Sequence, residues 1–138
     1  MSEKITLYYK ESNSEALACL IALEAVGYEV EFLRVDQKAL FGKDLKAINP
    51  SSLTPFAHSN SVTYLQASAI LRLVGRKNQE LYGKDILAKA KVDSMVDRML
   101  NVYSSHIDQI MDSVYDRLAT KVDFRKVDES IQRLIDFT

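Results

Sequence analysis

The chain has 138 residues, which is the length of one domain or of a small domain with an added helical layer. Hydrophobic residues make up 47% and charged residues 27%, a balance typical of a folded protein and not of a disordered one. Lysine and arginine number 18 against 19 aspartates and glutamates, so the net charge is −1. This argues against nucleic acid as a partner, because phosphate neutralisation requires a marked basic excess.

The cysteine content and the hydropathy of the chain exclude further classes of protein. The single cysteine, Cys19, excludes an internal disulfide and a Cys-rich zinc site, so we expect no metal and a reducing compartment. The longest strongly apolar stretch, residues 16–23, is far shorter than the ~20 residues of a membrane helix. Residues 5–9 are too short for a secretory signal. We therefore expect an intracellular, most plausibly cytoplasmic, protein without membrane insertion.

The first half of the chain alternates between strand and helix patterns. Residues 5–9 are β-branched and aromatic, which favours a strand. Ser12 and Glu15 have the spacing of a capping box at the start of a helix, and Gly27 is suited to the left-handed position after its end. The remaining predicted elements are a strand at 28–32, a short helix at 43–48, strands at 53–56 and 62–64 joined by a turn at 58–60, and a helix at 66–76. The predicted order is β-α-β-α-β-β-α.

The second half of the chain contains no proline, and we expect it to be helical. Apolar residues fall at helical spacing from Val92 to Val114, after a predicted N-cap at Asp85, and the pattern resumes at 127–135. We expect a long helix and a shorter one that form a hairpin. The short helix cannot cover the whole apolar stripe, so we predict that the stripe is partly exposed and marks an interface.

Three segments resemble glutathione transferases, in the order and spacing of that family. Residues 64–72, YLQASAILR, are similar to its QSxAILR segment, and residues 49–55, NPSSLTP, to its cis-proline turn. Residues 81–97 are similar to its LYGKD segment, which leads into the helical domain. The resemblance implies a thioredoxin-like α/β domain at 1–76 and a short all-α domain at 85–138, truncated relative to the family. The Tyr-type classes (alpha, mu, pi and sigma) look nearest, because the LYY strand at residues 7–9 places Tyr9 where those enzymes keep their catalytic tyrosine.

The resemblance assigns thiol activation to Tyr9. A hydroxyl that donates a hydrogen bond to a thiolate stabilises the anion and lowers the thiol pKa. The alternative is that Tyr8 and Tyr9 are one buried and one exposed residue of an ordinary strand. Ser12 and Ser14 are further hydroxyls near the same helix start, although capping explains them equally well.

The resemblance also implies a glutathione site. A cis Pro55 would expose the backbone of Thr54 to a peptide-like ligand, whereas a trans proline would simply begin an edge strand. Gln66 matches the residue that holds the glutamyl end of glutathione. The next position should be a serine and is Ala67, so the helix amide remains and a hydroxyl bond is lost. Asp97 matches an aspartate that reaches the ligand amino group across a dimer, or it belongs to a solvated acidic stripe.

Two functions remain open from the sequence. The first is a non-catalytic interaction subunit with a degraded glutathione site, favoured by Ala67, by Asn13 and Ser14 after the tyrosine, and by the short helical half. The second is an active glutathione transferase or glutathione-dependent peroxidase, favoured by Tyr9, Gln66 and Asp97. In both, glutathione is a possible ligand or substrate, and helices 85–115 and 126–137 are expected to contact a second copy or another protein.

Overall fold

The structure is a computed structural model that describes residues 3–11 and 13–119. A four-stranded mixed sheet forms its centre, with the strand order β2-β1-β3-β4. Strand β1 (Lys4–Tyr9) pairs in parallel with β2 (Glu29–Arg34) and antiparallel with β3 (Phe56–Ser59), which pairs antiparallel with β4 (Val62–Leu65). The predicted thioredoxin-like order of elements is confirmed.

Helix α1 (Ser14–Ala25) begins one residue later than the predicted cap implied. Its N-cap is Asn13, whose side chain accepts a hydrogen bond of 2.8 Å from the backbone N–H of Ala16. The predicted capping box, with Ser12 as the N-cap, is therefore wrong, because Asn13 holds the N-cap position. Asparagine accepts from the free amides of a helix start as well as serine does. At the other end Gly27 has φ +84°, and the amides of Gly27 and Tyr28 bond back to the carbonyls of Glu24 and Leu23. This Schellman arrangement confirms the predicted role of Gly27.

The β3–β4 hairpin also differs from the prediction in its boundaries. Asn60 and Ser61 both have positive φ, as a two-residue type I′ turn requires, so the turn lies after His58 and Ser59 and not on them. His58 instead extends β3 and pairs with Thr63. The residues before β3 form a loop, in which the Thr54–Pro55 peptide is cis, as predicted.

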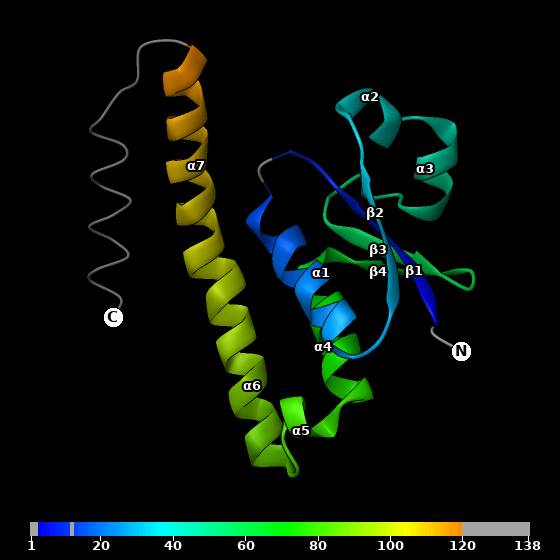
Figure 1. Ribbon diagram of the computed structural model, residues 1–138, viewed down its shortest axis with the longest axis vertical. Coiled ribbons are helices and arrows are strands. Elements are labelled where there is room, and N and C mark those ends of the chain that lie inside the picture. The colour runs from blue at the N-terminus through cyan, green and yellow to red at the C-terminus, as the bar shows by residue number, and fades with distance from the viewer. Residues whose placement is uncertain (1–2, 12, 120–138) are drawn as a thin grey trace.

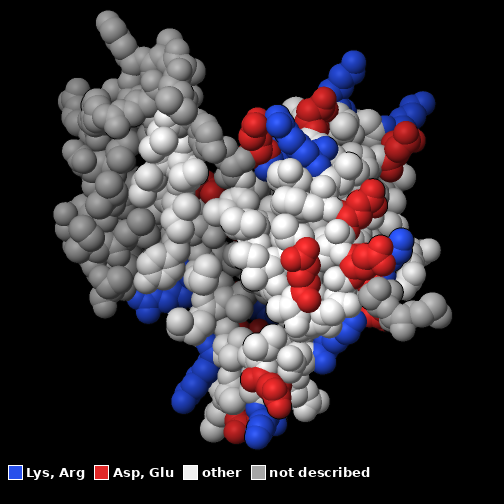
Figure 2. Space-filling model, viewed as in Figure 1, with Lys and Arg blue, Asp and Glu red and all other residues white. Residues whose placement is uncertain are grey.

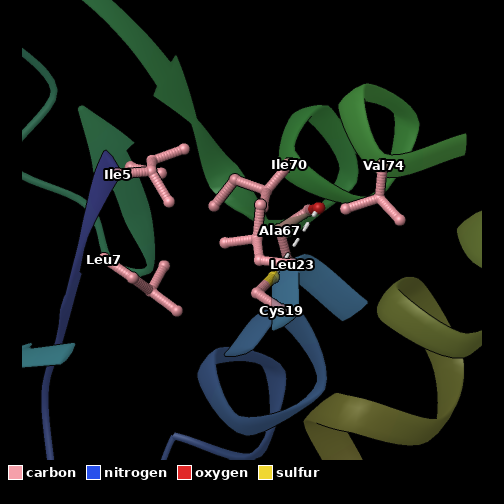
Figure 3. Packing of buried hydrophobic residues seen from close by; sticks show 8 residues of the cluster. Ile5, Leu7, Cys19, Leu23, Ala67, Ile70 and Val74 are labelled. Atoms are coloured by element: carbon pink, nitrogen blue, oxygen red, sulfur yellow. Dashed lines mark hydrogen bonds between the residues drawn. The ribbon is translucent and has the colours of Figure 1, made fainter. Parts of the chain in front are cut away.

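Helices cover both faces of the sheet. Helices α1 and α4 (Gln66–Lys77) pack on one face, and the short helices α2 (Gln37–Leu40) and α3 (Lys43–Ile48) on the other (Figure 1). The sequence did not predict α2. The larger core cluster joins β1, β3, α1 and α4. Figure 3 shows its side chains from β1, α1 and α4 pointing toward one another: Ile5, Leu7, Cys19, Leu23, Ala67, Ile70 and Val74; Ala57 of β3 completes the cluster.

A long helical rod runs alongside α1 and α4, and these two helices separate it from the sheet (Figure 1). After the short helix α5 (Gln79–Tyr82), the rod consists of α6 (Ile86–Arg98), a π-helical turn η1 (Met99–Tyr103) and α7 (Ser104–Ala119). Asp85 caps α6, as predicted, by accepting a hydrogen bond of 2.8 Å from the Ala88 amide. The rod confirms the predicted long helix, whereas the π turn within it was not predicted.

The apolar stripe of the rod is exposed at Met95, Met99, Ile107, Met111 and Val114, as predicted. The predicted helix at 127–135, and with it the contact segment 126–137, lies outside the described residues. Within residues 3–11 and 13–119, no helix has both the length and the apolar character needed to cross a membrane. On the face shown in Figure 2, acidic and basic side chains are interspersed around uncharged surface.

Candidate functional site

A pocket of about 260 Å³ lies where four parts of the fold meet. These are the loop before the cis proline, the first turn of α4, the first turn of α1, and the end of α6 with the π turn. The pocket is lined by Glu15, Leu53, Thr54, Gln66, Ala67, Ser68, Asp97, Leu100 and Asn101. Four of the five residues predicted to bind glutathione therefore line one pocket: Thr54, Gln66, Ala67 and Asp97.

Asn49, which is almost completely buried, stabilises the loop that carries Thr54. The Asn49 side-chain amide donates a hydrogen bond of 2.9 Å to the carbonyl of Leu53, and its oxygen accepts one of 2.6 Å from the Ser51 hydroxyl. Pro55 is buried behind the loop and does not line the pocket. The residues of this loop that line the pocket are Leu53 and Thr54, next to the cis proline.

The first turn of α4 forms one wall of the pocket. Gln66 has φ +69°, a left-handed conformation that costs a non-glycine residue about 1–3 kcal/mol; residues strained in this way cluster at active sites and ligand clamps. No side chain caps this helix, because its N-cap residue is Leu65. The first amides of a helix have no intrahelical acceptor, so this wall offers free donors to an anionic group.

Ala67 and Ser68 occupy different environments in this turn. Ala67 is almost completely buried and belongs to the core, where its carbonyl lies 3.9 Å from the Cys19 sulfur (Figure 3). Burial raises the pKa of the Cys19 thiol to about 12, so this sulfur is not a nucleophile at neutral pH. Ser68, one residue further along the helix, lines the pocket.

Asp97 forms an ion pair with Arg72 of α4. The Arg72 guanidinium contacts Asp97 at 2.7 Å and Asp93 at 2.9 Å, and the Tyr82 hydroxyl donates to both oxygens of Asp93 at 2.9 Å. The Tyr82 hydrogen bond, followed by Arg72, holds the pKa of Asp93 below its usual value. Within this chain Asp97 therefore has a cationic partner, and the network joins α4, α5 and α6.

Glu15 is the charged residue among the lining residues that the sequence did not assign to ligand binding; the others are Leu53, Ser68, Leu100 and Asn101. It is half-buried in the first turn of α1, near Asp108 on α7. Burial raises the pKa of Glu15, the negative charge of Asp108 raises it further, and a hydrogen bond with the buried Ser104 hydroxyl opposes both effects. The only sequence signal was its place one residue after the helix start, which we had interpreted as capping.

Tyr9 does not line this pocket. Its ring stacks on that of Phe32 in the neighbouring strand, with the ring centroids 3.8 Å apart and an angle of 8° between the planes. Tyr8 points to the opposite face and stacks on Phe56 at 4.5 Å. In the described part of the chain, no group of three or more His, Cys, Asp or Glu side chains is arranged to hold a metal ion.

Comparison with solved structures identifies the fold. A glutathione S-transferase-I bound with lactoylglutathione superposes with a TM-score of 0.83 at 22% identity, over 96% of this chain and 66% of that one. The theta-class enzyme of Xanthomonas axonopodis pv. citri with glutathione bound gives 0.82 at 16% identity, over 95% and 65%. Ure2p in complex with glutathione gives 0.76 at 16% identity, over 96% and 64%.

These comparisons define the class: the chain has the glutathione-transferase fold, a thioredoxin-like sheet followed by a helical region. It spans slightly less than two thirds of the length of these structures. No family model matches the sequence, and no curated protein does. The solved structures similar to it include theta-class and delta-class enzymes, so nearness to the Tyr-type classes stays a prediction.

Proposed function

We propose that this chain is a non-catalytic member of the glutathione-transferase fold, with a weakened glutathione site, that acts by binding other proteins or a second copy of itself. We place it in the cytoplasm and divide it into the units 1–76 and 85–138. The observation that carries the proposal is that Tyr9 does not line the pocket and that its ring stacks on Phe32. A hydroxyl lowers a thiol pKa only within hydrogen-bond reach of the sulfur, so a thiol held among the lining residues would lack this donor.

The chemistry of the pocket supports weak binding of glutathione. Glutathione carries two carboxylates and one ammonium group, so its net charge is negative at neutral pH. The described lining contains two carboxylates, Glu15 and Asp97, and no lysine or arginine. Ala67 offers no hydroxyl at the first turn of α4, which removes one hydrogen bond to a ligand carboxylate.

The exposed stripe of the rod supports the second half of the proposal. Met95 is 64% exposed and Met99 50% exposed, which is unusual for such large apolar side chains on a stripe. Burial of such a surface stabilises an interface by ~25 cal/mol per Å² before the costs of association. A homodimer is the first expectation, and a complex with another protein is the second.

Calorimetric titration with reduced glutathione, paired with a conjugation assay on a standard electrophile, tests the proposal. We expect no binding or only millimolar binding, and no conjugation above the uncatalysed rate. Micromolar binding together with conjugation that Tyr9→Phe abolishes would overturn it. Tyr103→Phe is the matched control, because Tyr103 lies in the rod and does not line the pocket.

An active transferase is the alternative function. It is favoured by the meeting of Thr54, Gln66 and Asp97 in one pocket, since these are the positions that the family resemblance assigns to glutathione. In that case the Tyr9 hydroxyl would donate a hydrogen bond to the bound thiol. Loss of conjugation in Tyr9→Phe, with glutathione affinity unchanged, would support this alternative.

A further inference from the structure

The most exposed large apolar side chains in the described part of the chain are two neighbours at the start of α6. Ile86 is 84% exposed and Leu87 is 76% exposed, whereas Met95, the next in order, is 64% exposed. Leu81 of the adjacent helix α5 is also exposed. Ile86 and Leu87 do not line the pocket, and they precede the exposed stripe of the rod, so they form a separate surface.

The packing of the first turn of α6 keeps this pair in solvent. Asp85 caps the helix, and Ala88 faces Gly83, where an added Cβ would lie 2.6 Å from the Cβ of Ala88. Each residue turns a helix by about 100°, so Leu87 lies one step and Ile86 two steps round from the side that packs on Gly83. Neither side chain takes part in that contact, and both stay exposed.

The charge around the apolar pair is positive, unlike that of the chain as a whole. Residues 76–91 contain five basic and two acidic side chains, a local charge of +3, whereas the net charge of the chain is −1. One of the two acids, Asp85, accepts the Ala88 amide as the helix cap. One of the five bases, Lys77, forms an ion pair with Glu3. An excess of positive charge remains after both contacts are counted.

Three of these bases are lysines that flank the apolar pair. With a rotation of about 100° per residue, Lys89 lies about 60° to one side of Ile86 and Lys91 about 40° beyond Leu87. Lys84 is exposed immediately before the cap. Within the described residues, no ion pair involves any of the three lysines. We call these five residues the α6 tip.

The α6 tip lies at an end of the molecule. The corner between α5 and α6 forms the lower end of the structure in Figure 1, beyond α4 and the sheet. A protruding end can contact a flat surface that the rest of the fold does not obstruct. Apolar side chains flanked by lysines are also the composition of segments that bind anionic membranes, where the apolar groups enter the acyl boundary and the lysines reach the phosphates.

We propose that the α6 tip docks on the surface of a membrane that contains anionic lipids. Ile86 and Leu87 enter the boundary between headgroups and acyl chains, and Lys84, Lys89 and Lys91 contact lipid phosphates. Two apolar side chains by themselves bind a bilayer weakly and reversibly, so the negative charge of the lipid decides whether the protein stays on the surface. This function is additional to the proposed function, because the tip is separate from the pocket and from the exposed stripe.

Co-sedimentation with vesicles tests the proposal on the full chain. One preparation contains phosphatidylcholine alone, and the other also contains about 30% phosphatidylserine, which supplies the negative charge. We expect about tenfold more protein on the anionic vesicles, and release from them as salt is raised, because salt screens the lysines from the lipid charge. Equal binding to the two preparations, or binding to neither, would overturn the inference.

Two pairs of variants test whether the apolar residues of the tip are responsible. Ile86→Ser with Leu87→Ser should lower binding to the anionic vesicles by about fivefold or more, whereas Leu17→Ser with Ile21→Ser should leave it unchanged. The control pair removes the same two residue types from exposed positions of α1. Binding that survives the loss of Ile86 and Leu87 would contradict the proposal.

Charge reversal tests the lysines in the same way. Lys89→Glu with Lys91→Glu should abolish binding to the anionic vesicles. Lys43→Glu with Lys46→Glu changes the net charge by the same amount on α3, and most of the binding should remain. An equal loss in both pairs would show that binding follows net charge and that the tip has no special part in it.

Tryptophan fluorescence shows whether the tip enters the lipid. The chain contains no tryptophan, so Leu87→Trp introduces a single reporter. Its emission should shift to the blue on anionic vesicles, whereas that of Leu17→Trp should not, and an unshifted Leu87→Trp would exclude insertion. If the parent chain ignores vesicles and Ile86→Ser with Leu87→Ser lowers its mass in light scattering, the tip is a protein contact and the inference is wrong.

Discussion

The hydroxyl of Ser14 donates a hydrogen bond of 2.9 Å to the carboxylate of Asp108, across 94 positions of sequence. Ser14 is the first residue of α1 and Asp108 lies on α7, so this bond joins the α/β unit to the helical rod. It lies beside Glu15 and Ser104, and the pocket therefore borders the junction between the two halves of the described chain.

We predict that Ser14→Ala loosens this junction. The variant leaves the half-buried Asp108 carboxylate without its hydroxyl donor, which should lower the free energy of unfolding by about 1–2 kcal/mol. Hydrogen exchange should accelerate in α7 more than in β1. Ser105→Ala is the control, because that exposed hydroxyl bonds only to the Val102 carbonyl within the rod. Equal exchange in both variants would contradict the prediction.

Glu15→Gln should stabilise the protein at neutral pH. Burial raises the folded-state pKa of Glu15 above its unfolded value, so the folded state holds the proton more tightly, and stability falls as pH rises through that range. The variant cannot ionise and escapes this loss. Because Glu15 is only half-buried, we expect a gain of about 0.5 kcal/mol at pH 7 that disappears below about pH 4.

Denaturant titration of the parent chain and Glu15→Gln at several pH values measures this difference directly. The pKa values of Asp93 and Glu3 are lowered, so both proteins lose stability as these groups take up protons at low pH. This loss is the same in the two proteins, and the difference between their stabilities therefore reports Glu15 alone. A variant that is less stable than the parent chain at pH 7 would show that the ionised carboxylate is favourable here.

Gly75→Ala should destabilise the contact between α4 and α5. A Cβ at this buried position would lie 2.9 Å from Cγ of Tyr82, so the tyrosine ring must move and its hydrogen bonds to Asp93 must weaken. Overpacking of this kind costs about 1–3 kcal/mol, more than alanine gains over glycine in a helix. Thermal unfolding measures the loss. A stabilised variant would mean that the ring is free to shift.

Ala67→Ser should tighten any residual binding of glutathione by about three- to tenfold, because it restores a hydroxyl at the first turn of α4. Ala67 lies against the core, so the new hydroxyl must turn toward the pocket, and a small loss of stability is expected. Calorimetry measures the affinity. Ala69→Ser, on the same helix but outside this pocket, is the matched control.

Met95→Asp combined with Met99→Asp should weaken self-association or partner binding through the exposed stripe. Both side chains are at least half exposed, so the fold should tolerate the change. Multi-angle light scattering should give a lower mass for the variant than for the parent chain. Ser94→Asp introduces charge at a neighbouring exposed position of α6 as a control. A parent chain that stays monomeric at high micromolar concentration without a partner contradicts the interface.

Local patterns predicted most of the fold because they act within one element. The alternation at Val30 and Phe32 placed β2, Gly27 ended α1, and Asp85 began α6. The α1 cap was misplaced because Asn13 and Ser12 are both good caps and differ by one position. The π turn at Met99–Tyr103 leaves no mark on an apolar spacing that continues through it.

The site was predictable only in part. Thr54, Gln66, Ala67 and Asp97 were found through resemblance to short segments, and the structure brings them together. Glu15 was not predicted, because its pKa is raised by burial and by Asp108, a residue that is distant in sequence and near in space. The stacking of Tyr9 on Phe32 is a contact between strands that no single-strand pattern encodes.

The π turn has a consequence for how the rod can change. A π turn holds one more residue than an α turn, so it accommodates an extra residue while the helices on either side keep their alignment. Upstream of it the rod packs on α4 through Asp97, and downstream on α1 through Asp108. A single-codon deletion within Met99–Tyr103 would therefore convert the π turn into an α turn and leave both contacts in place. The same deletion between Ser104 and Asp108 would rotate Asp108 by about 100° away from Ser14.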